Sequence, residues 1–225
     1  EVRRIDLASL SSVNNFTGQL LKEGRPVSLL MNNAGILTTP VRKTEDGLET
    51  IVSVNYVAPY MLTRQLLPLM QPGCRIVNTV SCTYGRIEPD FFEKGRNGRF
   101  FRIPVYSNTK LALLLFTQEF AERLQDKDIT INASDPGIVS TNMITMQAWF
   151  DPLTDILFRP FIKTPAQGAA TAIHLALSDE AKDRNGCCYA NCKKRNVSER
   201  IRHHAQQKQL WDDTEILLRQ KGIRF

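Results

Sequence analysis

The sequence lacks the features that mark several large classes of protein. It has no run of about 18 uncharged apolar residues, which is the length that a membrane-spanning helix needs. Glycine and proline contribute only 12 and 11 of the 225 residues, which excludes collagen-like and low-complexity chains. A hydrophobic content of 42% with 23% charged residues is instead typical of a globular protein with one sizeable core.

Cysteine is also scarce. Five cysteines are too few and too odd in number for a disulfide framework in a chain of this length, so we expect a reducing intracellular compartment. Cys187, Cys188 and Cys192 precede His203 and His204, but the cluster lacks the paired CxxC spacing of a zinc site. We therefore predict small buried thiols on a strand, and no metal.

The net charge of +6 suits an anionic partner such as nucleic acid, an acidic membrane surface or a phosphorylated cofactor. The densest basic run is Lys193 to Arg195, followed by Arg200 and Arg202, and it lacks the interleaved aromatic residues of an RNA-binding face. We interpret it as a solvated surface and expect no nucleic-acid partner.

Strand-like and helix-like segments alternate along the chain. Short apolar runs at residues 27–31, 75–80 and 129–133 predict buried strands, and a further strand is expected near residues 186–191. Segments with helical spacing occupy residues 48–70, 105–124, 165–177 and 206–219. The alternation predicts an α/β fold, a doubly wound parallel sheet that forms a single domain over residues 1–225.

Polar or turn-forming residues follow each of the first three strands. Ligands of an open parallel sheet bind beyond the carboxyl ends of the strands. That rule selects Asn33, Ser81 and Pro136 as positions near a binding crevice.

Tyr106 and Lys110 are four residues apart on a predicted helix, so their side chains project from the same face. A phenol with a pKa of about 10 is a poor base at neutral pH, and a neighbouring ammonium stabilises the phenolate and lowers that pKa. The pair therefore predicts a proton donor and acceptor. The alternative is a chance surface pair, which is common at this spacing.

The series NNAG at residues 32–35, Asn55, Ser81, the YxxxK of Tyr106 and Lys110, and PGxVxT at residues 136–141 resembles the short-chain dehydrogenase/reductase family. The resemblance covers nearly the whole chain. The long segment between Ser81 and Tyr106, the GCCYANC strand and the LWDDTEILL tail are similar to the retinol dehydrogenase-like branch. The resemblance implies a Rossmann-like fold and an NAD(P)-dependent oxidoreductase.

The resemblance also implies catalytic roles for four residues. Tyr106 is expected to be the general acid in carbonyl reduction and the base in alcohol oxidation, and Lys110 to lower its pKa and bind the nicotinamide ribose. Ser81 is expected to hydrogen-bond the substrate oxygen, and Asn55 to hold a water in the proton relay. The alternatives are a hydroxyl that caps a strand end for Ser81 and an exposed helical position for Asn55.

Further residues match the cofactor-binding positions of the family. Asn33, Ala34 and Gly35 are expected to lie along the adenosine half, and Asp6 with Leu7 to contact the adenine; a helix N-cap is the alternative for Asp6. The positions expected at the nicotinamide and its neighbouring phosphate, in addition to Tyr106 and Lys110, are Pro136, Gly137, Val139 and Thr141. We expect NADP(H) rather than NAD(H).

The sequence departs from the family at two places. Asp135 precedes Pro136 where histidine is frequent, and no TGxxxGxG phosphate loop occurs anywhere in the chain. The resemblance places that loop and the first strands before Glu1, so that an expected strand at residues 1–6 would lack its neighbour and the isolated chain would be unstable.

This second departure leaves two hypotheses open. The first is an active oxidoreductase, a homodimer when complete. The second is a catalytically silent form that pairs with full-length subunits through the helices at residues 48–70 and 105–124.

An apolar segment at residues 143–162 follows the predicted nicotinamide-binding turn. It suits a substrate lid, and the alternatives are peripheral contact with a membrane surface and a part of the core. Phe91, Phe92, Phe100 and Phe101 are expected to form another wall of the pocket. These walls predict an apolar carbonyl compound or alcohol as the substrate.

Overall fold

A computed structural model of the protein describes residues 1–37, 42–83, 85, 87, 91–92, 102–139 and 163–225. Its centre is a five-stranded sheet in the order β1-β2-β3-β4-β5, whose first four strands are parallel and whose last is antiparallel. The strands are β1 (Val27–Asn32), β2 (Met70–Thr79), β3 (Ile129–Asp135), β4 (Cys188–Ala190) and β5 (Lys193–Lys194). The sheet confirms the predicted α/β class, and four of the five predicted strands are present. The prediction that the strand at residues 27–31 is buried is wrong, because Leu29 and Met31 of β1 are 39% and 38% exposed.

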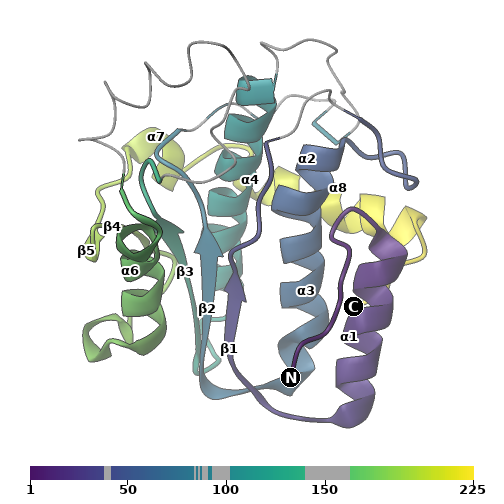
Figure 1. Ribbon diagram of the computed structural model, residues 1–225, viewed down its shortest axis with the longest axis horizontal. Coiled ribbons are helices and arrows are strands. Elements are labelled where there is room, and N and C mark those ends of the chain that lie inside the picture. The colour runs from purple at the N-terminus through teal and green to yellow at the C-terminus, as the bar shows by residue number, and fades with distance from the viewer. Residues whose placement is uncertain (38–41, 84, 86, 88–90, 93–101, 140–162) are drawn as a thin grey trace.

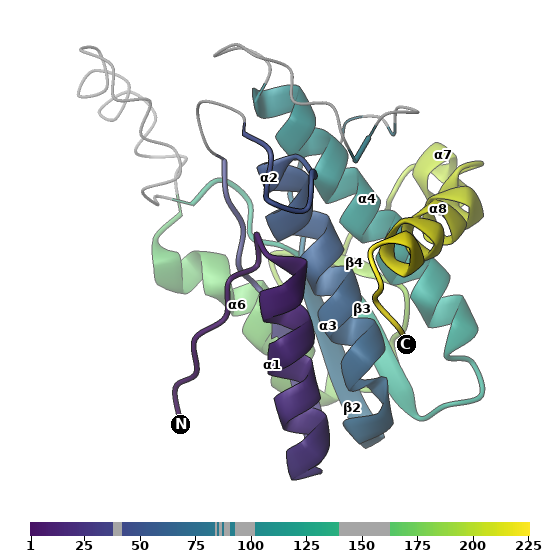
Figure 2. The same ribbon diagram turned by 90° about the vertical axis from the view of Figure 1, so that its right-hand side faces the viewer.

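Helices cover both faces of the sheet, as a doubly wound fold requires. The sheet lies between α6 on one side and α3 and α4 on the other, with α1 beside α3 (Figures 1 and 2). The bounds are α1 (Leu10–Glu23), α3 (Ala58–Leu66), α4 (Arg102–Arg123), α6 (Pro165–Leu177), the short α7 (Glu199–Arg202) and α8 (Gln207–Gln220). In the part of the chain that the structure describes, no helix is long and apolar enough to cross a bilayer.

The helix predicted at residues 48–70 is a succession of different helical turns. It consists of α2 (Thr50–Val52), the π-helix η1 (Ser53–Val57), α3 and the 3₁₀ turn η2 (Leu67–Leu69). Pro59 has no N–H to donate to the carbonyl of Asn55, four residues earlier, so regular α-helical bonding is interrupted at this point. The resulting π turn carries Asn55, and such turns are frequent at functional sites.

The prediction of a strand at residues 1–6 is wrong. These residues form no strand and run alongside α1, where Arg3 makes an ion pair of 2.6 Å with Glu23 (Figure 1). Further along, Ser53 donates a hydrogen bond of 3.1 Å to the carbonyl of Leu7. Side-chain contacts, rather than a strand ladder, therefore hold this segment in place.

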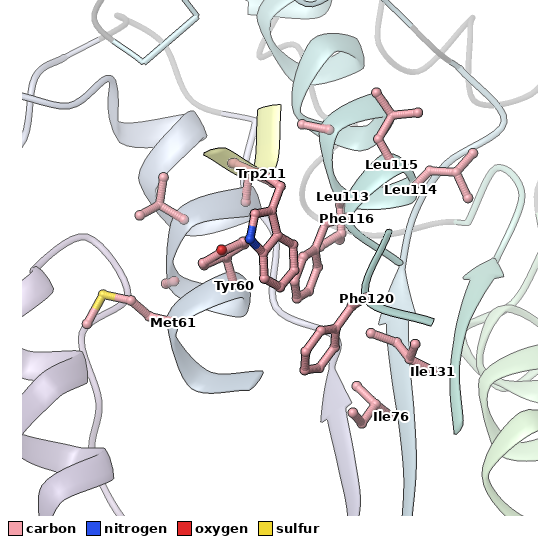
Figure 3. Packing of buried hydrophobic residues seen from close by; sticks show 14 of the residues in the cluster. Tyr60, Met61, Ile76, Leu113, Leu114, Leu115, Phe116, Phe120, Ile131 and Trp211 are labelled. Atoms are coloured by element: carbon pink, nitrogen blue, oxygen red, sulfur yellow. The ribbon is translucent and has the colours of Figure 1, made fainter. Parts of the chain in front are cut away.

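The core between the sheet and α8 is rich in aromatic rings. Trp211 of α8 packs on Phe116 and Phe120 of α4, with ring centroids 5.9 and 5.6 Å away, and on Tyr60 of α3 at 5.2 Å (Figure 3). Ile76 and Ile131 of the central strands lie beneath these rings (Figure 3). α8 thereby closes the outer side of the α3 and α4 layer.

α8 packs against α3 and α4, which belong to the helices through which the second hypothesis pairs this chain with full-length subunits. Tyr56 hydrogen-bonds Thr214 at 2.8 Å, while Tyr60 at 2.7 Å and Arg64 at 2.8 Å both donate to Glu215. The part of these helices that α8 covers is closed to another subunit, so the structure does not favour the hypothesis of a silent form that pairs through them.

Candidate active site

The first three strands end side by side at one edge of the sheet. The register pairs Asn32 with Asn78 and Thr79 with Ser134, so the residues that follow each strand are neighbours. Thr79 donates a hydrogen bond of 3.2 Å to the side chain of Asn33 across this edge. The carboxyl ends of the strands thus meet the N-terminal half of α4, as the ribbon shows (Figure 1).

Lys110 lies beneath this edge, with its side chain almost entirely buried. Only 3% of the residue is exposed, and its Nζ donates a hydrogen bond of 2.8 Å to the carbonyl of Thr79. The Nζ lies 5.5 Å from the centre of the Tyr106 ring, so the two side chains do share one face of α4. Burial lowers the pKa of Lys110 to about 8, because an ammonium is poorly solvated there.

Tyr106 is half-buried at the same edge, and its acidity differs from the expectation. Burial raises the pKa of the phenol, and the hydrogen bond from Ser81 opposes that rise, while the nearby Cys82 and Asp135 add to it. The expected net lowering of this pKa is wrong for this structure, because desolvation outweighs the influences that favour the phenolate. Tyr106 therefore holds its proton at neutral pH.

Ser81 lies next to Tyr106. Its hydroxyl is hydrogen-bonded to the phenol and also lies 3.1 Å from the hydroxyl of Thr83, whose N–H donates to it at 3.3 Å. The structure thus brings Ser81, Tyr106 and Lys110 together, where a carbonyl oxygen could accept hydrogen bonds from two hydroxyl groups.

Asn55 is buried, which excludes the alternative of an exposed helical position. Its side-chain amide makes two hydrogen bonds with the backbone of Ile36. Oδ1 accepts from the N–H of Ile36 at 2.8 Å, and Nδ2 donates to the carbonyl of Ile36 at 3.0 Å. Nδ2 also lies 3.4 Å from the hydroxyl of Thr109, which donates to the carbonyl of Tyr106 at 2.7 Å. The side chain of Asn55 therefore joins the β1 turn to α4, and its role in holding a water stays a prediction.

Gly35 lies directly over the buried ammonium. A side chain at this position would begin 3.4 Å from the Nζ of Lys110 and 3.5 Å from the Oδ1 of Asn55. Asn33 and Ala34 are exposed on the solvent side of the same turn. The absence of a side chain at Gly35 lets this turn lie close to the buried ammonium.

Asp6 and Leu7 lie in the loop before α1. The carboxylate of Asp6 accepts a hydrogen bond of 2.9 Å from Ala8, whereas the N-cap of α1 is Ser9, whose hydroxyl accepts from Ser12. The alternative of an N-cap role for Asp6 is therefore wrong. Asp6 is exposed, and its contact with an adenine stays a prediction.

Pro136, Gly137 and Val139 form the turn after β3. Gly137 has a φ of 74°, which favours glycine, and its N–H donates to Asp135 at 2.9 Å. Val139 is paired with Lys163 and packs on Gly168 of α6. The turn is thus fixed from the side of α6.

Several predicted residues lie outside the described part of the chain or have another role. Thr141, the segment 143–162, Phe100 and Phe101 lie outside the described residues. Phe91 is 7% exposed and packs edge-on against Tyr56 at 5.6 Å, with Phe92 at 6.4 Å. Phe91 therefore belongs to the core over η1 and does not line a substrate pocket as predicted, whereas the role of the partly buried Phe92 stays a prediction.

The cysteine and basic clusters also need correction. Cys188 is buried in β4, but Cys187 and Cys192 are only partly buried and lie just outside the strand. Lys193 and Lys194 are exposed, as a solvated surface requires, whereas Arg195 forms an ion pair of 2.7 Å with Asp135. Sequence reasoning missed this pair, and its one signal was the unusual residue before Pro136.

Comparisons with known proteins agree with this fold. The family model described as short chain dehydrogenase matches residues 1–149. Retinol dehydrogenase 14 of Homo sapiens is 36% identical over 222 residues, which are 96% of this chain and 66% of the relative, so this chain spans about two thirds of that protein's length.

Two solved structures are similar over most of the chain. An uncharacterized protein from Mycobacterium Paratuberculosis superposes with a TM-score of 0.76 at 28% identity, covering 97% of this chain and 75% of that one. A blue fluorescent protein from a metagenomic library, solved in complex with NADPH, gives a TM-score of 0.62 at 28% identity, with 83% and 72% covered. With a matching family model over more than half of its residues, the chain belongs to the short chain dehydrogenase family.

Proposed function

We propose that the protein is an NADP(H)-dependent oxidoreductase that interconverts an apolar carbonyl compound and its alcohol. The observation that carries this proposal is the convergence of Ser81, Tyr106 and Lys110 at the carboxyl edge of the sheet. A hydroxyl, a phenol and a buried ammonium in one place are the groups needed to hold an oxygen and exchange a proton with it.

The residues fit a nicotinamide cofactor. The nicotinamide, when bound, supplies or accepts the hydride. Gly35 has no side chain next to the Nζ of Lys110, to which a ribose hydroxyl would bind, and the Pro136 to Val139 turn follows β3 at the same edge. The preference for the phosphorylated cofactor is supported by the NADPH in a structure that is 28% identical to this chain.

In the direction of reduction, the substrate oxygen accepts hydrogen bonds from Ser81 and Tyr106. Tyr106 passes its proton to this oxygen as negative charge develops there, and Ser81 stabilises that charge. The raised pKa of Tyr106 keeps the phenol protonated at neutral pH, as an acid must be. Lys110, whose pKa is about 8, is mostly charged at neutral pH and stabilises the phenolate that remains.

In the direction of oxidation, Tyr106 must first lose its proton to act as the base. Its raised pKa makes that step harder, so oxidation is expected to accelerate with pH. The apolar class of the substrate is supported by the similarity to a retinol dehydrogenase, since retinol is an apolar alcohol.

The decisive experiment is Tyr106→Phe in the native protein. We expect turnover to fall by about 10²–10⁴-fold while NADPH is still bound, because only the proton donor is removed. Steady-state assays with retinal and smaller apolar aldehydes, together with NADPH fluorescence titration, measure both quantities. Turnover retained in this variant would reject the mechanism.

A further inference from the structure

Several polar side chains hold the turn that follows β3 through hydrogen bonds and an ion pair. Asp135, at the end of β3, is only 2% exposed. One of its carboxylate oxygens accepts the N–H of Gly137 at 2.9 Å, and the other accepts from Arg195 at 2.7 Å. A carboxylate this deeply buried is costly unless it is paired in this way.

A second side chain, that of Lys163, also holds this turn. Lys163 donates a hydrogen bond of 2.9 Å to the carbonyl of Pro136 and another of 2.7 Å to the side chain of Asn191. Its side chain lies against Gly137, where an added Cβ would be 3.1 Å from the Nζ. The carbonyl of Pro136 and the N–H of Gly137 are thus both fixed by side chains.

Asn191 and Arg195 come from the same hairpin. β4 and β5 pair Ala190 with Lys193, so that Asn191 and Cys192 form the turn between them. Both turn residues have positive φ, 51° and 58°, as two-residue hairpins of this kind require. The N–H of Cys192 donates to Thr171 of α6 at 3.2 Å, which anchors the hairpin tip to the same layer as Lys163.

We propose that Asp135 with Arg195, and Lys163 with Asn191, form a clamp that fixes the Pro136 to Gly137 turn for the nicotinamide half of the cofactor. These four are positioning residues, because they act through the turn. The inference rests on the proposed function and deepens it. It assigns a role to the residue that departs from the family's frequent histidine: only an acidic side chain here can pair with Arg195.

The first test is Asp135→Ala, with the dissociation constants of NADPH and of 2′-phospho-ADP-ribose measured on the native protein. The second ligand lacks nicotinamide and binds through the adenosine half alone. We expect NADPH binding to weaken by about tenfold or more, as expected for loss of a charge-assisted hydrogen bond. Binding of 2′-phospho-ADP-ribose should change by less than about twofold, since the turn lies away from Asn33 and Gly35.

Arg195 offers a variant that tests the same pair from its more exposed side. Its side chain is 34% exposed, so Arg195→Met is expected to fold. Arg195→Met should weaken NADPH binding as Asp135→Ala does, and Arg195→Lys, which keeps the cation, should restore most of it. Equal affinities in the methionine and lysine variants would overturn the clamp.

Glu215→Gln is the matched control, because it changes another buried carboxylate that an arginine meets, here Arg64 at 2.8 Å. It should lower the unfolding temperature without altering the affinity for NADPH. Asp135→Ala that binds NADPH as the unaltered protein does, or that loses both ligands equally, contradicts the proposal. Failure of the unaltered protein to bind either NADPH or NADH would instead refute the proposed function, and the clamp with it.

Discussion

The two halves of α4 have opposite properties. The N-terminal half holds Tyr106 and Lys110 at the edge of the sheet, where the ammonium of Lys110 is buried and its pKa falls to about 8. The C-terminal half holds Phe116 and Phe120 under α8, where their rings stack on Trp211. One half thus keeps a group that destabilises the fold, and the other supplies the packing that offsets it, as is common where active sites sit on stable scaffolds.

The largest expected effect on stability is that of Trp211→Ala. This side chain is 5% exposed, touches three aromatic rings and lies 4.2 Å from the guanidinium of Arg123. Its removal should lower the free energy of unfolding by about 3–5 kcal/mol, the usual cost of a buried tryptophan. Urea unfolding measures this loss, and Leu177→Ala, at a 72% exposed position of α6, is the control. Equal losses in the two variants would show that α8 is not part of the core.

Ser81→Ala tests the active-site side of the comparison, where a substitution should lower activity and leave stability almost unchanged. The hydroxyl lies at the edge of the sheet with Tyr106, and its loss should lower kcat by about 10²–10³-fold, as expected for an oxyanion donor. The free energy of unfolding should stay within about 0.5 kcal/mol, the usual range for a surface substitution. Thr83→Ala, which removes the neighbouring hydroxyl, is the control. If both variants lose the same activity, Ser81 has only a local structural role.

The sequence predicts the strands and the face shared by Tyr106 and Lys110 well, but it predicts pKa values and ion pairs poorly. Parallel strands are often continuous apolar runs, so β1 and β3 could be located closely, although only β3 is buried, and the spacing of Tyr106 and Lys110 places both on one face. The pKa of Tyr106 could not be predicted, because it depends on burial by distant segments. The pairing of Asp135 with Arg195 joins residues 60 positions apart, which no local pattern shows.

Contacts between distant segments also decide the structure of residues 1–6 and the position of α8. Residues 1–6 have a strand-like sequence, but a strand exists only where a neighbouring strand satisfies its hydrogen bonds. The helix α8 was predicted from its periodicity, whereas its position over α3 and α4 follows from which apolar faces remain uncovered.

Lys110→Met should show that the N-terminal half of α4 lowers the stability of the fold in a way that depends on pH. The pKa of Lys110 is about 8 in the folded chain and 10.5 when unfolded, so the folded state bears the full cost of the charge below pH 8. Stability rises with pH between these values, because only the unfolded chain still binds the proton. At pH 7 the variant should be about 1–3 kcal/mol more stable than the unaltered protein, the lost hydrogen bond to Thr79 being a partial offset.

Urea unfolding at pH 7 and pH 9.5 measures this effect, and the gain should shrink at the higher pH. Lys22→Met, at an exposed position of α1, should give the same small change at both. The variant is also expected to be inactive, since Lys110 belongs to the site. A variant that is less stable at pH 7 than the unaltered protein would contradict the view that the buried ammonium destabilises the fold.

The smallest expected effect is that of Tyr60→Phe under α8. The phenol donates a hydrogen bond of 2.7 Å to Glu215, a carboxylate that also accepts from Arg64 and so remains paired when the phenol is lost. The cost should therefore be about 1.5 kcal/mol, at the lower end for a bond to a charged group. Tyr56→Phe, which breaks a neutral bond of 2.8 Å to Thr214, should cost less. Because both bonds join α8 to η1 and α3 and involve neither Tyr106 nor Lys110, kcat and the affinity for NADPH should not change, and a change in either would mean that the packing of α8 is coupled to the active site.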